Sequence, residues 1–203
     1  MKIRCLTVGP MQANCYLLSD EKGRTVVIDP GDEAGRILEQ IRKDGLTAEA
    51  VLLTHAHFDH FLAADEVRRQ TGAPLWVYKT DASALADPGR SLTMLAKGGS
   101  TPLQPDRLLE DGEEMTIGNL ILHVLHTPGH TPGSCCFLCG DALFSGDTLF
   151  AGSIGRTDFP GGDSRAMAAS LRMLASLERN YRVYPGHGEE TTLERERMQN
   201  PYF

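Results

Sequence analysis

The most informative segment of this sequence is Thr54-His55-Ala56-His57-Phe58-Asp59-His60. It follows the apolar run Ala50–Leu53, which is typical of a buried strand, and it leads into a helical pattern. In an extended turn, His55 and His57 project to the same side, because alternate residues of an extended chain share a face. Asp59 and His60 come next, at the start of the predicted helix, where a second cluster can form beside the first.

The chemistry of these side chains indicates a metal site. Imidazole nitrogens and carboxylate oxygens are the ligands expected for zinc, iron or manganese. A lone histidine is usually a core or surface residue, but here three of the seven histidines in the chain and an aspartate fall within six residues. So many polar groups beside a hydrophobic strand would cost free energy unless a metal ion satisfied them.

Three later segments repeat one pattern, in which an apolar strand ends and is followed by glycine and a possible ligand. They are His126-Thr127-Pro128-Gly129-His130-Thr131-Pro132-Gly133-Ser134, Phe144-Ser145-Gly146-Asp147-Thr148 and Tyr184-Pro185-Gly186-His187-Gly188. Each is weak alone, since Gly-Asp and Gly-His steps are common in turns. Together they predict that several strand ends converge on one site.

The order of the predicted elements indicates an α/β fold. Strands are expected at Lys2–Val8, Asn14–Ser19, Thr25–Asp29, Ala50–Leu53, Leu75–Tyr78 and Arg182–Tyr184, with a meander of short strands from Leu108 to Gly146. Helices are expected at Glu33–Lys43, Phe58–Gln70, Ser164–Leu177 and Leu193–Gln199. This order suits a four-layer αββα sandwich, in which two mixed sheets pack face to face with helices outside, within one domain of residues 1–203.

Composition restricts the class of protein. The chain has 203 residues, of which 41% are hydrophobic and 23% charged, the balance of a soluble globular enzyme. A net charge of −7 argues against a nucleic-acid binder. No stretch has the length of a membrane span, and the N-terminus lacks the pattern of a signal peptide. We therefore expect a cytoplasmic protein without nucleic-acid or membrane partners; the sequence carries no signal for its oligomeric state.

The five cysteines do not suggest a disulfide framework, because their number is odd. Cys136-Phe137-Leu138-Cys139 is formally a CxxC motif, but it lies in an apolar run that is typical of a strand. Residues three apart on a strand point to opposite faces, so the two thiols cannot share one metal. We interpret them as buried strand residues.

These motifs, with Ile28-Asp29-Pro30-Gly31 and Gly155-Arg156-Thr157-Asp158-Phe159, closely resemble the metallo-β-lactamase superfamily, and within it the glyoxalase II group. The resemblance covers nearly the whole chain. It implies two divalent metal ions, with zinc expected first and iron or manganese as alternatives. One ion would bind His55, His57 and His130, the other Asp59, His60 and His187, with Asp147 bridging both. His126 matches a position that is not a ligand in this family.

Two further residues have alternative interpretations. Asp29 could simply end a strand in an Asp-Pro-Gly turn, where aspartate is common. The resemblance implies instead that it supports the metal-binding loops by hydrogen bonds, without being a ligand. Arg156 occupies the place of a basic substrate contact in glyoxalase II enzymes, but it could equally be a loop arginine paired with Asp158 or Asp163.

The resemblance implies hydrolysis of acyl thiols such as S-lactoylglutathione. A hydroxide bridging the two ions would attack the carbonyl, and Asp59 would accept its proton and pass it to the leaving group. Long glyoxalase II enzymes add a C-terminal helical region, whereas this chain ends 16 residues after His187. It therefore looks more like the short glyoxalase II-like hydrolases, whose thiol carrier need not be glutathione.

Three alternatives to this function stay open. Persulfide dioxygenases resemble the chain at residues 155–159 but use one iron, on the counterparts of His55, His130 and Asp147. A non-catalytic metal-binding module on the same fold, or a lactonase, is also compatible with the ligand set. Separately, the stretch Asp87–Pro105 is long, irregular and rich in glycine and proline, which predicts a lid beside the metal site.

Overall fold

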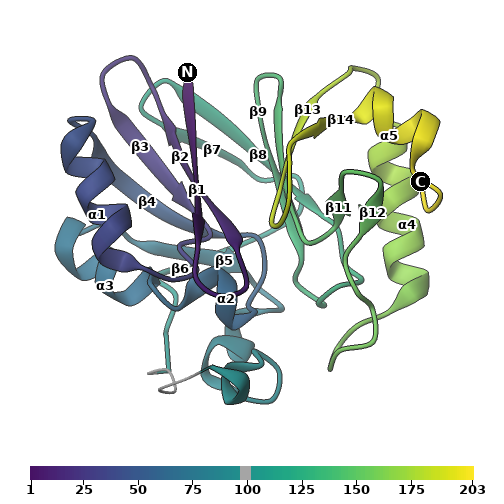
Figure 1. The fold of residues 1–203 in the computed structure, drawn as a ribbon, viewed down its shortest axis with the longest axis horizontal. Helices are drawn as coiled ribbons and strands as arrows, with labels where there is room; N and C mark the ends of the chain where they lie inside the picture. Colours follow the sequence, from purple (N-terminus) through teal and green to yellow (C-terminus); the bar gives the residue numbers. More distant parts are fainter. Residues whose placement is uncertain (97–101) are drawn as a thin grey trace.

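Two six-stranded mixed sheets form the centre of the structure, a computed structural model that describes residues 1–96 and 102–203 (Figure 1). The strands of the first sheet lie in sequence order. β2 pairs antiparallel with both β1 and β3, whereas β3, β4, β5 and β6 run parallel to one another. They are β1 (Lys2–Val8), β2 (Ala13–Ser19), β3 (Arg24–Ile28), β4 (Thr47–Leu53), β5 (Leu75–Tyr78) and β6 (Arg107–Leu109).

The second sheet has the strand order β14-β13-β10-β9-β8-β7. Its strands are β7 (Glu114–Ile117), β8 (Leu120–His126), β9 (Cys135–Cys139), β10 (Ala142–Gly146), β13 (Arg182–Pro185) and β14 (Thr191–Thr192). β7 to β10 form an antiparallel meander, and β13 adds to β10 in parallel. The short strands β11 (Leu149–Phe150) and β12 (Ser153–Ile154) pair with each other.

Helices cover the outer faces of both sheets (Figure 1). α1 (Ala34–Lys43) and α3 (Ala64–Thr71) lie against the first sheet, while α4 (Ser164–Ala175) and α5 (Leu193–Gln199) lie against the second. α1 is amphipathic: Ile37 and Ile41, one turn apart, are its buried residues. All seven residues of β2 are buried, as expected for a strand with both faces covered. The predicted four-layer αββα sandwich is therefore confirmed.

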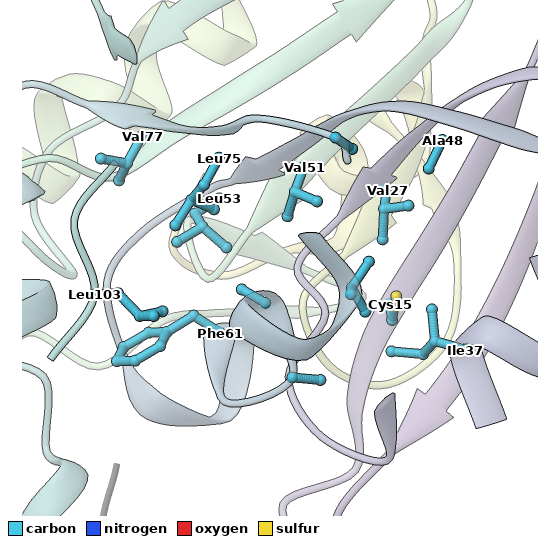
Figure 2. Packing of buried hydrophobic residues seen from close by; sticks show 14 of the residues in the cluster. Cys15, Val27, Ile37, Ala48, Val51, Leu53, Phe61, Leu75, Val77 and Leu103 are labelled. Atoms are coloured by element: carbon cyan, nitrogen blue, oxygen red, sulfur yellow. The ribbon is translucent and has the colours of Figure 1, made fainter. Parts of the chain in front are cut away.

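Three layers of apolar contact hold the sandwich together. The inner cluster joins the two sheets and includes the edge-to-face pair Tyr16 and Phe144, whose ring centroids lie 5.2 Å apart. An outer cluster joins the first sheet to its helices, and in Figure 2 Phe61 of α2 (Phe58–Phe61) lies beside Leu103 in it. Cys136 belongs to the cluster under α4, and Cys139 to the inner cluster. The two thiols thus lie on opposite faces of β9, as predicted.

The prediction of a single helix at Phe58–Gln70 is wrong, because the structure has two helices there, α2 and α3. The backbone N–H of Ala63 donates to the carbonyl of Pro30 at 3.0 Å, so the Asp-Pro-Gly turn takes the place of the intrahelical partner. Gly31 lies so close that an added Cβ would fall 1.7 Å from the Asp59 carbonyl oxygen. This turn therefore sets the point at which α2 ends, just beyond His60.

The meander predicted from Leu108 begins later than expected, since β6 belongs to the first sheet. Val77 of β5 pairs with Leu108 in parallel register. The pairing starts at Asp106, whose backbone N–H donates to the Leu75 carbonyl at 2.7 Å and whose carboxylate accepts from the Leu75 N–H at 2.7 Å.

In the part of the chain that the structure describes, no helix combines the length and apolarity needed to span a bilayer.

Candidate metal centre

The seven predicted ligands come from the ends of strands in both sheets. His55 and His57 follow β4, and Asp59 and His60 lie in α2 directly after them. The other three are His130 in the β8–β9 loop, Asp147 after β10 and His187 after β13. Parallel strands end at the same edge of a sheet, which is why segments far apart in sequence meet here. The structure brings all seven side chains into one cluster.

The first group consists of His55, His57 and His130, whose ligand-type atoms lie within 4.8 Å of one another. His57 Nδ1 lies 2.8 Å from His130 Nε2. The Nδ1–H of His130 donates to the carbonyl oxygen of Arg156 at 2.7 Å. This bond fixes the tautomer in which His130 Nε2 presents a lone pair to the cluster.

The second group consists of Asp59, His60 and His187, again within 4.8 Å. His187 Nε2 lies 3.3 Å from both Asp59 Oδ2 and His60 Nε2. On its other side, His60 donates through Nδ1–H to Asp29 Oδ2 at 3.0 Å. His60 Nε2 is therefore the atom that faces Asp59 and His187.

Asp147 lies between the two groups. Its Oδ2 is 3.4 Å from His130 Nε2 and 3.7 Å from His187 Nε2, and its Oδ1 is 3.5 Å from His60 Nε2. The end of β13 approaches this carboxylate very closely, since a Cβ on Gly186 would fall 2.2 Å from Asp147 Oδ1. Asp147 thus contacts histidines of both groups, which is the position needed to bridge two ions.

Asp29 lies outside both groups; it contacts the second directly, through His60, and the first only through Thr54. Its carboxylate accepts from Thr54 N–H at 2.8 Å, from Thr54 Oγ1 at 2.7 Å and from His60 Nδ1. Thr54 Oγ1 lies 3.1 Å from His55 Nδ1, so the contact extends to the first group. The backbone of Asp29 is left-handed, with φ of 52°, a conformation that aspartate tolerates better than most residues. This placement is the one expected of a residue that orients ligands.

Burial and neighbouring charges divide the cluster into two electrostatic halves. Burial, and then the nearby His130 and His60, lower the pKa of His57 to about 3. The pKa of His55 is also well below its usual value, mainly through burial. Both imidazoles are thus neutral near pH 7 and have lone pairs available for a metal.

In the other half, carboxylates dominate. Burial opposes protonation of His60, but Asp147, Asp59 and Asp29 outweigh it and raise its pKa to about 10. Burial would also raise the pKa of Asp59, yet His60 and His187 hold it below its usual range. The negative potential around His60 Nε2 therefore favours positive charge at the position that the second group encloses.

Unsatisfied atoms test whether these residues fit a metal. Three buried side-chain atoms have no hydrogen-bond partner within residues 1–96 and 102–203, namely His55 Nε2, His57 Nε2 and Asp147 Oδ1. All three belong to the cluster, and leaving a buried polar group unpaired costs about 1–3 kcal/mol. Together with a nitrogen and oxygen donor set, this fits borderline divalent ions such as zinc, iron or manganese.

Arg156 is paired with Asp158, one of the two alternatives predicted. Its guanidinium donates to both carboxylate oxygens of Asp158 at 2.7 and 2.8 Å and lies 4.2 Å from the ring centroid of Phe159. The Phe159 ring is in turn 5.7 Å from that of His57. The arginine thus lies near the first group, while its substrate contact stays a prediction.

The two remaining histidines of the second sheet lie outside both groups. His126 stacks on Tyr78, with ring centroids 4.2 Å apart and planes 8° from parallel, and its Nε2–H donates to the Pro132 carbonyl. His123 is in β8 opposite Glu114, 3.8 Å from its carboxylate. Neither histidine belongs to the candidate ligand groups among the described residues, and the prediction that His126 is not a ligand stays a prediction.

Sequence analysis missed Asp81, a buried carboxylate just after β5. It accepts hydrogen bonds from Ala56 N–H, Thr131 Oγ1 and Gly133 N–H. One signal could have drawn attention to it: Asp81 comes shortly after the predicted strand Leu75–Tyr78, much as Asp29 ends the predicted strand Thr25–Asp29.

The predicted lid, Asp87–Pro105, includes residues 97–101, which lie outside the described residues. In the described part, Ser91 accepts a hydrogen bond from the Phe58 N–H at 2.9 Å. Leu92 is buried, whereas Met94 and Leu95 are exposed. This part of the segment therefore contacts the start of α2, between His57 and Asp59, and the lid itself stays a prediction.

The sequence model of the metallo-β-lactamase superfamily matches residues 8–187. The chain belongs to this superfamily. It is 42% identical to a probable metallo-hydrolase, YqgX, of Bacillus subtilis, over all of this chain and 98% of that protein. It is 35% identical to the hydroxyacylglutathione hydrolase GloC of Haemophilus influenzae, over all of this chain and 98% of that protein. The chain is thus a member of a metallo-hydrolase superfamily.

Solved structures of superfamily members share the fold. The B3 metallo-β-lactamase BLEG-1 matches with a TM-score of 0.94 and 37% identity, covering 99% of both chains. TTHA1623, solved in a di-iron-bound form, matches with a TM-score of 0.89 and 40% identity over 98% of this chain and 100% of its own. ETHE1 from Myxococcus xanthus has a TM-score of 0.84 and 32% identity, over 99% of this chain and 84% of its own. Members of this superfamily bind divalent metals, and the di-iron form shows that their metal is not always zinc.

Proposed function

We propose that this chain is a binuclear metallohydrolase that cleaves acyl-thiol substrates such as S-lactoylglutathione. The observation that carries the proposal is the position of Asp147 between two complete ligand groups. His55, His57 and His130 would hold one ion, and Asp59, His60 and His187 the other. Zinc is the expected metal, with iron or manganese as alternatives.

The bound ions would supply Lewis acidity and lower the pKa of water toward neutrality. The protein residues then have separate tasks. The Asp59 carboxylate is ionised at neutral pH, so it can accept the proton of the attacking water and return it to the departing thiolate. Asp29 and the Arg156 carbonyl hold His60 and His130 in the tautomers that leave Nε2 free. The cluster therefore needs no serine or cysteine nucleophile.

Two observations support the acyl-thiol class. GloC, whose name states hydroxyacylglutathione hydrolysis, aligns with this chain from end to end. The guanidinium of Arg156 lies near the first ligand group, stacked on Phe159, and is 61% exposed. Because this guanidinium is already paired with Asp158, it would bind a carboxylate of a peptide thiol carrier by exchanging that exposed partner for the substrate.

A substrate screen tests the proposal. Metal-loaded protein is assayed against thioesters, lactones, β-lactams and glutathione persulfide, with the His187→Ala variant as the inactive control. We expect thioesters to give the highest kcat/KM. Turnover of β-lactams or lactones with no thioesterase activity would contradict the substrate class but leave the metal centre intact.

A second candidate is a mono-iron persulfide dioxygenase. The resemblance at residues 155–159 favours it. So do two features of the site: His130 Nε2 lies 3.4 Å from Asp147 Oδ2, and the buried His55 Nε2 has no hydrogen-bond partner among the described residues. Those three side chains could hold one iron. Oxygen consumption with glutathione persulfide, at one iron per chain, would establish this function instead.

A further inference from the structure

Asp81 is a buried carboxylate whose role the proposed reaction does not include. It follows β5 and has 0% exposed surface. Burial is the main reason why its pKa lies above the usual value, so its position costs free energy that its contacts must offset. Oδ2 accepts from Ala56 N–H at 3.0 Å and Thr131 Oγ1 at 2.7 Å, and Oδ1 accepts from Gly133 N–H at 2.8 Å.

These three donors come from the two loops that carry the first ligand group. Ala56 lies between His55 and His57, and Thr131 directly follows His130. One carboxylate thus spans the β4–α2 loop and the β8–β9 loop. A neighbouring side chain adds to the connection, since Thr80 Oγ1 donates to the Pro132 carbonyl at 2.9 Å.

The close packing around Asp81 shows that the contact depends on the local sequence. A Cβ on Gly133 would fall 2.6 Å from Cβ, Cγ and the backbone nitrogen of Asp81. Any larger residue at this position would push the loop off the carboxylate. The glycine of the second Thr-Pro-Gly repeat is therefore required for the close approach of this loop to β5.

Asp29 makes different contacts on the other side of β4. It bonds Thr54 and His60, and so reaches the second ligand group, which Asp81 does not contact. β3, β4 and β5 are parallel neighbours, so the two carboxylates flank the histidine loop at the end of the strand that lies between them.

We propose that Asp81 is a positioning residue for the first ligand group alone. It holds the Ala56 backbone, between His55 and His57, and the His130 loop at the separation that one metal ion requires. It thereby sets how tightly the first group binds its ion. The affinity of the second group, Asp59, His60 and His187, for its ion does not depend on Asp81. This inference rests on the proposed two-metal function.

The test is a stepwise zinc titration of metal-free Asp81→Asn protein by calorimetry. Asparagine keeps the shape and two of the acceptor bonds, but its amide NH₂ faces the Gly133 N–H in place of an acceptor. We expect one of the two dissociation constants to rise about 10–100-fold, the usual effect of removing a partner that orients ligands. The other constant should not change.

Histidine side-chain NMR during the same titration identifies the weakened site. The Nδ1 protons of His130 and His60, which are bonded to Arg156 and Asp29, report on the first and second groups respectively. In Asp81→Asn, the His130 signal should respond at higher zinc concentration than in the unaltered protein. The His60 signal should respond at the same concentration in both.

Matched variants separate positioning from a general loss of stability. Thr131→Val removes one donor to Asp81 and should weaken the same site to a smaller extent, while Thr131→Ser should restore affinity. These two variants decide the question if Asp81→Asn fails to fold. Asp44→Asn removes a carboxylate from a surface ion pair with Arg4 and should change neither constant.

Two results would overturn the inference. One is that the altered proteins bind both ions as tightly as the original, and the other is that both constants rise by the same factor. If the unaltered protein itself binds fewer than two ions, the proposed function fails rather than the role of Asp81.

Discussion

Substituting Asp29 by asparagine isolates the contribution of one buried charge to the metal centre. Asparagine has nearly the same shape and also tolerates the left-handed backbone of this position, where φ is 52°. Alanine would add backbone strain of about 1 kcal/mol and confuse the comparison. The change therefore alters hydrogen bonding and charge with little effect on packing.

The magnitude follows from the three bonds of Asp29. If the asparagine amide oxygen takes the place of Oδ2, its NH₂ faces the Thr54 N–H and one bond is lost. In the opposite orientation the NH₂ faces His60 Nδ1, which must then accept a hydrogen bond, and the proton moves to Nε2, where it blocks a ligand. Losing one buried charge-assisted bond costs about 1.5–3 kcal/mol. For a chain of this size, about 2 kcal/mol lowers Tm by about 4–8 °C.

Two assays measure these effects. Thermal unfolding of the metal-free protein, followed by circular dichroism, gives the change in Tm. Competition with a chromogenic zinc chelator gives metal affinity, which we expect to fall about 10–100-fold. Asp65→Asn, a partly exposed carboxylate on α3, is the control and should change neither value. If Asp29→Asn keeps the original Tm and zinc affinity, Asp29 does not orient His60 and our account of the second group is incorrect.

Three further predictions concern single residues of the cluster. His130→Ala should reduce turnover by orders of magnitude, whereas His126→Ala, which loses only its stacking and one loop bond, should be mild; the reverse order in kcat/KM would contradict the ligand assignment. Asp147→Asn should lose metal and activity together, as measured by elemental analysis, and full retention of both would refute the bridging role. The raised pKa of His60 stabilises the folded metal-free protein. This stabilisation is complete below pH 6.5, the ordinary pKa of histidine, and is lost as the pH rises through about 10. The lowered pKa of His57 acts in the opposite direction, so stability falls as pH falls from 6.5 toward about 3. The Tm of metal-free protein should peak near pH ~6.5, and a flat profile would contradict these charges.

The histidine cluster could be predicted from sequence because its chemistry is local. His55, His57, Asp59 and His60 lie within six residues after a buried apolar strand, where few other roles suit them. The more distant candidate ligands could be predicted only from the repeated strand-glycine-ligand pattern and the resemblance to the superfamily.

Asp81 could not be assigned in the same way, because its role depends on partners far away in the sequence. Ala56 precedes it by 25 residues, and Thr131 and Gly133 follow it by 50 and 52. Its place after a predicted strand marks Asp81 as a residue of interest, but no local pattern shows which donors it binds.

The errors in the predicted elements also arose from tertiary contacts. The apolar spacing of residues 58–70 is helical, but the Pro30 carbonyl takes the N–H of Ala63 and divides the helix. Leu108 has the pattern of a meander strand, yet its neighbour Asp106 pairs with Leu75 and directs β6 into the first sheet. Periodicity predicts the type of an element but not the sheet that it joins.

The most direct test of the two-metal hydrolase is a titration of activity against metal. Zinc is added in small steps to metal-free protein, and thioester hydrolysis is measured at each step. We predict that activity rises until two ions are bound per chain and then stays constant, because both ligand groups must be filled. A plateau at one ion per chain, or iron-dependent oxygen uptake with a persulfide and no thioester hydrolysis, would contradict the account.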